Sequence, residues 1–136
     1  MVGQQLSSNI HQGNFASDAA KANMGDPWKM PTYDQANELI NGTNSTWTTV
    51  NGKNGRKFIN KKDSTKYIFL PAGGWWWETN LNDVGTNGYY WTNQYSTYPE
   101  AIRLSFSSTN PSLGAYNKPY GLSVRANKQR YLSKFL

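Results

Sequence analysis

The sequence predicts an α+β fold, in which two short helices precede a strand-rich half with antiparallel sheets and long loops. Helix formers and capping signals are concentrated before residue 43. From Thr46 onward, β-forming residues alternate with polar residues, and Gly and Asn turn signals separate the runs. Helices that come before the strands, and do not alternate with them, are typical of the α+β class.

Each predicted helix has its own start signal. The first covers residues 17–24, with Ser17 as its N-cap and Gly25 as its stop. The second begins at Thr32, because Thr32 and Gln35 have the spacing of a capping box. Its predicted buried stripe consists of Ala36, Leu39 and Ile40.

The strand-rich half is predicted to contain hairpins and then a three-stranded antiparallel set. Asn51-Gly52 has the sequence of a type I′ turn, and Asn54-Gly55 gives a second turn signal. Residues 73–88, 93–99 and 108–119 are expected to be loops, the first of them rich in Gly. The predicted strands cover residues 46–50, 57–59, 66–70, 88–92, 100–107 and 120–126.

The length of 136 residues predicts one domain, which we expect to span residues 1–126. Residues 127–136 form a basic and apolar tail. Four apolar side chains would be unusual in a free tail, so we expect it to pack on the body of the domain or on a partner subunit. These side chains are Tyr131, Leu132, Phe135 and Leu136.

Composition limits the function classes. The chain has no Cys, which excludes disulfides, thiolate metal sites and Cys nucleophiles. Its net charge is +6, but the basic residues gather in residues 53–66 and near the C-terminus without a nucleic-acid signature, so no nucleic-acid partner is expected. No apolar run is long enough to span a bilayer, and no membrane insertion is expected.

Short blocks of scaffold-like sequence keep one order along most of the chain, and stretches of Trp, Tyr, Asn and Ser separate them. The division favours recognition over catalysis, since it leaves aromatic and polar residues for a surface. The blocks are Asp18-Ala19-Ala20, Trp28-Lys29-Met30-Pro31-Thr32, Ile68-Phe69-Leu70-Pro71-Ala72-Gly73-Gly74, Gly88-Tyr89-Tyr90-Trp91 and Gly121-Leu122-Ser123-Val124-Arg125.

In this order the blocks resemble the Fibrobacter succinogenes major paralogous domain, a family with a C-type-lectin-like fold. The resemblance runs from about Asp18 to Ala126, and it departs at the front, where members often have a longer N-terminal region. It implies a compact core whose long loops display a variable face. Such domains occur on surface proteins of Bacteroidota, in fimbrial tip-like adhesins and in phages. The chain is also similar to the variable proteins of diversity-generating retroelements.

The residue inventory argues against the enzymes known on the lectin-like fold. The formylglycine-generating type needs a Cys pair, and the sulfoxide-forming type needs several His at an iron site, whereas His11 is the only His here. A hydrolase using Glu78 and Glu100 is the weakest alternative. We therefore expect no enzymatic activity and no cofactor.

A calcium-dependent lectin site is not expected either. Such lectins use a carboxylate-Pro-amide triplet and a Trp-Asn-Asp triplet, and the nearest segments here are Tyr98-Pro99-Glu100 and Leu81-Asn82-Asp83. Neither supplies the set of oxygen ligands that calcium requires. We expect no metal, although an ion at Glu78, Asn82 and Asp83 stays open.

The candidate binding residues are aromatic and amide side chains in the predicted loops. Trp75, Trp76 and Trp77 cannot all point inward, and Trp76 is the sharpest test of binding. The alternative is that Trp75 and Trp77 fill the core and Trp76 covers a strand edge. The second set can instead reflect ordinary turn chemistry. It comprises Asn93, Gln94, Tyr95, Tyr98, Asn110, Tyr116, Asn117 and Tyr120, while Trp28, Trp47, Trp91 and Phe106 are assigned to the core.

The sequence thus predicts a non-catalytic, metal-independent recognition domain that binds a glycan or protein receptor on a bacterial surface. Its expected location is a virion, the cell surface or the extracellular space. The alternative is a structural virion component, such as a head or tail decoration or a fibre domain. In that case the same loops and the tail would contact other virion or adhesin subunits.

Overall fold

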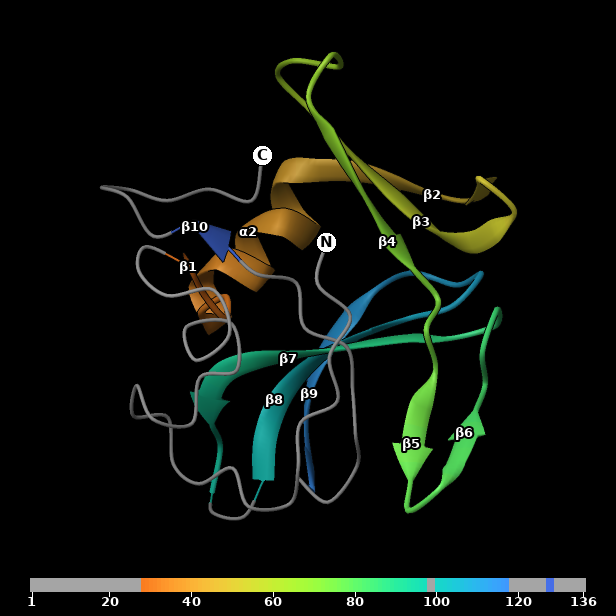
Figure 1. The fold of residues 1–136 in the computed structure, drawn as a ribbon. Helices are drawn as coiled ribbons and strands as arrows, with labels where there is room; N and C mark the ends of the chain where they lie inside the picture. Colours follow the sequence, from red (N-terminus) through yellow and green to blue (C-terminus); the bar gives the residue numbers. More distant parts are fainter. Residues whose placement is uncertain (1–27, 98–99, 118–126, 129–136) are drawn as a thin grey trace.

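The computed structural model describes residues 28–97, 100–117 and 127–128 (Figure 1). Within these ranges it contains one helix and ten strands, which form two three-stranded and two two-stranded antiparallel sheets. The predicted α+β, C-type-lectin-like fold with two helices is therefore wrong for this part of the chain, which is mostly β. Strands occupy segments that the turn signals had assigned to loops. The helix predicted over residues 17–24 lies outside the described residues.

Helix α2 (Tyr33–Gly42) follows the predicted local chemistry. The Gln35 backbone N–H donates to Thr32 Oγ1 (3.1 Å), and the Thr32 N–H donates to Gln35 Oε1 (3.0 Å), so the predicted capping box is confirmed. At the other end the Thr43 hydroxyl donates to the Leu39 carbonyl, one of the acceptors that a helix C-terminus leaves unpaired. Leu39 is buried, which anchors the helix to the sheets.

The first three-stranded sheet contains β2 (Thr43–Val50), β3 (Lys53–Asn60) and β4 (Tyr67–Pro71). Asn51 and Gly52 both have positive φ, 52° and 78°, which confirms the predicted type I′ turn between β2 and β3. The turn predicted at Asn54-Gly55 is wrong, because both residues lie inside β3. A Cβ at Gly55 would meet the Phe69 ring at 2.6 Å, so this Gly serves close packing.

The second three-stranded sheet has the order β7 (Gly88–Tyr95), β8 (Glu100–Phe106) and β9 (Ser112–Asn117). Strand β7 continues into residues expected to form the loop 93–99, and β9 occupies residues expected to form the loop 108–119. Those two loop predictions are therefore wrong in part. The strand predicted over residues 120–126 lies outside the described residues.

The two remaining sheets have two strands each. Strand β1 (Trp28–Lys29) pairs with β10 (Asn127–Lys128), so the first two residues of the predicted tail lie beside the first described strand. Strands β5 (Trp75–Trp77) and β6 (Asn80–Asn82) form a hairpin within residues 73–88, where we had expected an unstructured loop. Figure 1 shows this hairpin projecting from the end of β4.

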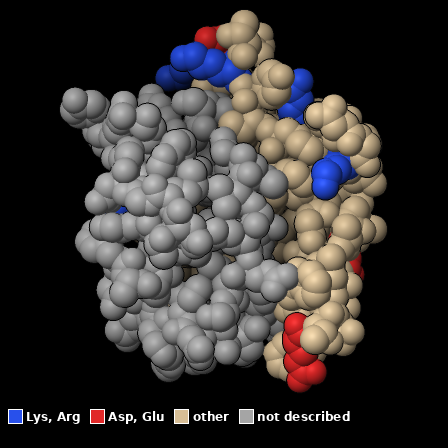
Figure 2. Space-filling view, in the orientation of Figure 1, with Lys and Arg blue, Asp and Glu red and all other residues tan. Residues whose placement is uncertain are grey.

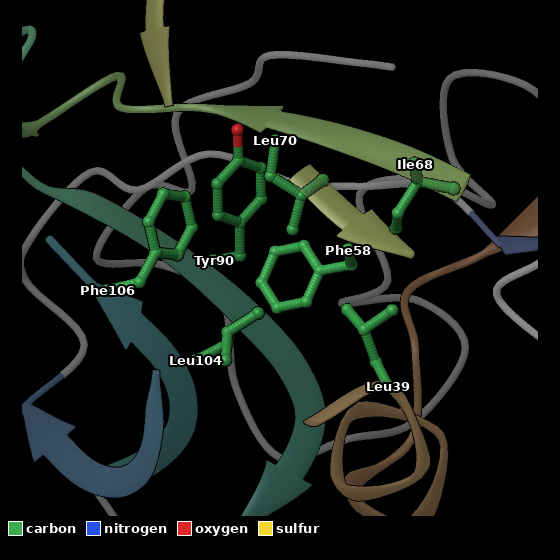
Figure 3. Packing of buried hydrophobic residues seen from close by; sticks show 7 residues of the cluster. All are labelled: Leu39, Phe58, Ile68, Leu70, Tyr90, Leu104 and Phe106. Carbon is green, nitrogen blue, oxygen red and sulfur yellow. The ribbon is translucent and has the colours of Figure 1, made fainter. Parts of the chain in front are cut away.

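The core lies where α2 and the two three-stranded sheets meet (Figure 3). Phe106 packs edge-on against Phe58, with ring centroids 6.1 Å apart, and stacks on Tyr90 at 5.9 Å. The Tyr90 hydroxyl donates to the Pro71 carbonyl (2.8 Å), which joins β7 to the end of β4. Phe106 and Trp91 are buried, as predicted, and Trp47 packs against the core while partly buried; the side chain of Trp28 is not described.

Arg56 makes a second contact between the two three-stranded sheets. Its side chain shares a face of β3 with Phe58, and the residue is only 5% exposed. Its Nε donates to Ser45 Oγ (2.8 Å), and its Nη1 donates to the Ser107 carbonyl (3.0 Å) just beyond β8. Burial lowers the pKa of the Arg56 guanidinium, since removal from water disfavours the charged form. These hydrogen bonds offset that cost.

Replacing Arg56 with Ala is expected to lower the free energy of unfolding by about 2–4 kcal/mol. The Ser107 carbonyl and the Ser45 hydroxyl would lose their donor, and the aliphatic part of the side chain would leave a void. Denaturant melts of R56A and of K53A, an exposed Lys at the start of the same strand, provide the comparison. Equal midpoints for the two variants would refute this role of Arg56.

Candidate functional site

A pocket of about 260 Å³ opens at one end of the β7–β8–β9 sheet, where β7 begins, β8 ends and β9 begins. Its lining combines hydroxyl, amide, aromatic and guanidinium groups. Arg103 is the one charged residue among the described residues that line it. The lining residues are Asn87, Tyr89, Arg103, Ser105, Phe106, Ser107, Thr109, Asn110, Ser112 and Tyr116.

The strand register explains why the main groups of the pocket share a face. Tyr89 pairs with Ser105, and Ser105 pairs with Ser112, so these side chains lie on the sheet face opposite to the buried Tyr90 and Leu104. Arg103 lies on the same face of the central strand, two pairs further along, where it pairs with Trp91. At the pocket end the alternation therefore brings polar side chains to this face, whereas Trp91 is buried on the same face further along the sheet.

Arg103 is held between two tyrosine rings. Its guanidinium carbon lies 4.3 Å from the centroid of the Tyr89 ring and 3.4 Å from that of the Tyr116 ring. The two tyrosines are diagonal neighbours of Arg103 on the flanking strands, a separation that aromatic and long side chains can bridge. The Arg103 Nε donates to Ser105 Oγ (3.1 Å), which also fixes the rotation of the guanidinium plane.

Gly114 makes this sandwich possible. It pairs with Arg103 across β8 and β9, and a Cβ at this position would meet the Tyr116 ring at 3.0 Å. The ring of Tyr116 therefore folds back over the bare backbone of Gly114 to reach the guanidinium. Covering a Gly of an edge strand with an aromatic ring is a known way of shielding exposed backbone.

Hydrogen bonds fix the rim of the pocket. Most are between residues that line it, and one comes from Arg56, which does not line it. Ser107 Oγ accepts from the Thr109 N–H (3.1 Å) and pairs with Thr109 Oγ1 (2.8 Å), which shapes the turn between β8 and β9. The Ser107 carbonyl is held by Arg56. On the opposite rim Asn87 Nδ2 donates to the Tyr89 hydroxyl (2.7 Å). The pocket is thus largely formed before any ligand arrives.

The β5–β6 hairpin presents the second candidate surface. Trp75 and Trp76 are half-buried, whereas Trp77 is 44% exposed, so Trp77 and not Trp76 is the most accessible indole. Leu81 and Val84 are also exposed, by 44% and 56%. Leu81 pairs with Trp76, so its side chain and that of Trp77 lie on opposite faces of the hairpin. We call Trp77, Leu81 and Val84 the hairpin patch.

The hairpin has strained backbone at two residues, and hydrogen bonds hold it in place. Glu78 in its turn and Asp83 after it have positive φ, 53° and 59°, which costs energy for residues other than Gly. Trp75 Nε1 donates to Asp83 Oδ2 (2.9 Å). The Asp83 carbonyl in turn accepts from the Thr86 and Asn87 backbone N–H groups. Because Asn87 lines the pocket, residues 83–87 connect the hairpin to the pocket.

The structure brings only part of the predicted binding set together. Asn110 and Tyr116 line the pocket, and Trp75, Trp76 and Trp77 lie on the hairpin. Asn93, Gln94 and Tyr95 lie at the far end of β7, away from the pocket. Tyr98, Tyr120 and the side chain of Asn117 lie outside the described residues.

Sequence reasoning missed Tyr89, Arg103 and Asn87 as pocket residues. Tyr89 had been read as part of a scaffold block, and Arg103 as part of a core strand. The signal was nevertheless present, because Arg103 stands at an outward position between Ile102 and Leu104. Since alternate residues of a strand face opposite sides, a polar residue there belongs to the solvent face.

Charge is distributed unevenly on the visible surface. Figure 2 shows basic side chains around the β3–β4 turn and acidic side chains at the tip of the β5–β6 hairpin. The exposed Lys61, Lys62 and Lys66 belong to the former and Glu78 to the latter. In the described part of the chain, no three His, Cys, Asp or Glu side chains form a group that could hold a metal ion. No helix in that part has the length and apolar character to cross a membrane.

The hairpin depends on Gly74, which gives a direct test of this geometry. Gly74 has φ of 67°, and a Cβ there would lie 1.9 Å from the Asn82 carbonyl oxygen. The G74A variant is expected to be less stable than G52A by about 2 kcal/mol or more, because Gly52 has similar φ but open space around it. Denaturant melts followed by Trp fluorescence measure both. Equal losses would show that the backbone does not pass over Gly74 as described.

No curated protein and no solved structure matches the chain. Residues 30–126 match the family DUF8237, described as a domain of unknown function. The matched region includes every described element that builds the pocket and the hairpin patch. The resemblance to the Fibrobacter succinogenes major paralogous domain stays a prediction, since no comparison bears on it. The match covers well over half of the sequence, and the chain therefore belongs to the DUF8237 family.

Proposed function

We propose that this chain is a non-catalytic recognition domain that binds a glycan, without a metal, in the pocket at the end of the β7–β8–β9 sheet. The observation that carries the proposal is the lining of that pocket. It combines tyrosine rings with several hydroxyl and amide groups. A bacterial surface or a virion is the proposed setting.

The lining groups match the chemistry of a saccharide. Hydroxyl groups of Ser105, Thr109 and Ser112 can both donate and accept, as sugar hydroxyls do. The amide of Asn110 offers donors and an acceptor on one exposed side chain. The exposed ring of Tyr116 gives a face on which the C–H groups of a sugar can pack.

The rigidity of the pocket supports binding more than turnover. Its side chains stand on paired strands and are braced by Arg56, Ser107 and Asn87. Preorganised polar groups lose little entropy when a ligand binds. The described lining includes no carboxylate or His that could exchange a proton with a substrate near neutral pH. The hydrolase alternative with Glu78 and Glu100 gains no support, because neither residue lines the pocket.

The test is glycan-array binding with variants in the pocket. We expect N110A to weaken binding by roughly 3- to 10-fold, the loss of one or two hydrogen bonds, and Y116A to weaken it more, since the ring also shapes the pocket. The matched controls are N44A and Y67A, an exposed amide on β2 and an exposed ring on β4 that do not line it. An array with no bound glycan, or binding that N110A and Y116A leave intact, contradicts the proposal.

A contact between protein subunits is the second candidate, as in a virion or adhesin assembly. The hairpin patch favours it, because three apolar side chains are exposed on a projecting hairpin, with Trp77 and Leu81 on its two faces. Exposed apolar surface of this kind is typical of protein contacts.

Light scattering over a concentration series tests the subunit contact. We expect the chain to self-associate and the double variant W77S/L81S to remain monomeric, because it removes most of the apolar area. The control V50S/Y67S removes two exposed apolar side chains from the β2–β3–β4 sheet and should associate like the parent. A monomer at all concentrations, or equal association of both double variants, rules out this use of the hairpin patch.

A further inference from the structure

We infer that the outer edge of strand β2 binds an extended segment of a partner protein, which adds to the β2–β3–β4 sheet as a further strand. Strand β2 lies at one edge of this sheet (Figure 1). Within the described part of the chain, no element pairs with the side of β2 that faces away from β3. This edge is separate from the proposed glycan site, because β2 contributes none of the described residues that line the pocket.

The strand register shows which backbone groups of β2 face outward. Residues opposite each other in an antiparallel pair alternate between hydrogen-bonded and non-hydrogen-bonded pairs. The Lys61 N–H donates to the Gly42 carbonyl (3.0 Å), so the adjoining pair Thr43–Asn60 is of the non-hydrogen-bonded kind. Every second residue of β2 after Thr43 repeats this geometry. The residues whose N–H and C=O groups therefore point away from β3 are Ser45, Trp47 and Thr49.

Most of these outward backbone groups are available to another strand. The Ser45 carbonyl accepts a long hydrogen bond from Arg56 Nη2 (3.3 Å). Within the described ranges, the backbone N–H and C=O groups of Trp47 and Thr49 make no such hydrogen bond. A row of unpaired backbone groups along an edge is a template for strand pairing. Main-chain hydrogen bonds of this kind supply the affinity when a peptide adds to a sheet.

Two other edges of the large sheets are protected, whereas the edge of β2 is not. At the edge of β4, Pro71 has no N–H, and its carbonyl accepts from the Tyr90 hydroxyl (2.8 Å). At the edge of β7 the register shifts after Trp91, and the Asn93 N–H donates to the Pro31 carbonyl (2.8 Å). Strand β2 is 8 residues long and has no charged side chain, Pro or register shift, which are the usual protective devices. An edge that stays open over this length is suited to binding a strand.

The surroundings of β2 indicate the chemistry of the added strand. Alternate side chains of that strand would lie beside Trp47, which packs against the core, and beside Thr46 on the outer face. The same outer face carries Lys53 and Lys57 on β3, and neither β2 nor β3 has an acidic residue. The partner segment is therefore one in which apolar residues alternate with Asp or Glu. A second copy of this chain fits less well, because its β2 is uncharged and its β3 is basic.

The first experiment uses the parent chain, so that folding of a variant is not at issue. The probe is a blocked synthetic peptide of about seven residues, long enough to cover Ser45 to Thr49, in which Val alternates with Glu. Amide hydrogen exchange is measured by NMR with and without the peptide. We expect exchange to slow by about tenfold or more at Trp47 and Thr49, and much less at Thr46 and Thr48, whose N–H groups already bond to β3. No protection of Trp47 and Thr49 at millimolar peptide, or protection of another strand instead, overturns the inference.

The second experiment tests the backbone edge with a matched pair of variants. T49P removes an outward N–H and places a ring where the added strand would lie. T49V keeps the N–H and removes only the hydroxyl, which donates to Asn54 Oδ1 (2.7 Å). We expect T49P to weaken binding of the Val/Glu peptide by about tenfold or more, and T49V to change it by less than about twofold. Thermal melts confirm that both variants fold. Equal binding by T49P and the parent, or an equal loss in T49V, contradicts this use of the edge.

Two further outcomes test the chemistry of the partner. A copy of the peptide with Lys in place of Glu should bind several-fold more weakly, and high salt should reduce this difference, because ions screen the attraction. Equal binding of the two peptides at low salt contradicts an acidic partner. Light scattering tests the alternative occupant. Self-association of the parent that T49P abolishes and T49V retains would make a second copy the occupant, and would also contradict the inference.

Discussion

The packing of Phe106 is the interaction on which the rest of this structure depends. Its ring lies between the two three-stranded sheets, edge-on to Phe58 and stacked on Tyr90, and it fills the space above Gly88, where a Cβ would come within 2.1 Å of the ring. Large rings contribute much of the buried area in a chain with few aliphatic residues. Phe106 also lines the pocket. The last residue of β8 therefore belongs to the core and to the candidate site at once.

A site built this way takes its geometry from the whole fold. Ser107 follows Phe106 directly, and its carbonyl is held by Arg56 from the other sheet. The turn that carries Asn110 is thus tied to both sheets. Tyr89 and Tyr116 stand on the strands that flank Arg103. Functional groups on paired strands are held more accurately than groups on loops, because each strand is fixed by its neighbours. The pocket is accordingly preorganised, which favours selectivity.

Local signals were predicted well from the sequence because they need only neighbouring residues. The capping box of α2 and the Asn51-Gly52 turn depend on side chains three residues apart or fewer, and both are confirmed. Asn54-Gly55 carries the same kind of signal and is wrong, because Phe69 packs over Gly55 from the next strand. Sequence alone cannot show that contact. A Gly in a turn signal does not form a turn where a residue packed against it leaves no room for a Cβ.

The candidate site was harder to predict, because its geometry also depends on contacts between residues of different strands. Asn110 and Tyr116 were identified by composition, since amides and tyrosines are enriched on recognition surfaces. Arg103 and Tyr89 were missed because their role depends on the register of β7, β8 and β9. The long loop expected over residues 73–88 is a hairpin because Gly74 lets the chain pass close to Asn82, a contact between residues that the period of two does not reveal.

The pocket and the hairpin patch differ in how they are supported, and this difference bears on their use. The pocket lies on a three-stranded sheet that packs on the core. The hairpin has two short strands, and an isolated two-stranded hairpin is marginally stable in water. It is retained by the Trp75–Asp83 hydrogen bond and the close passage at Gly74, while Glu78 and Asp83 carry unfavourable φ. A rigid pocket can discriminate between small ligands, whereas a hairpin held by few contacts can adjust to a large one. Residues 83–87 join the two surfaces. A ligand long enough to touch both would meet the polar groups of the pocket at one end and the exposed indole of Trp77 at the other.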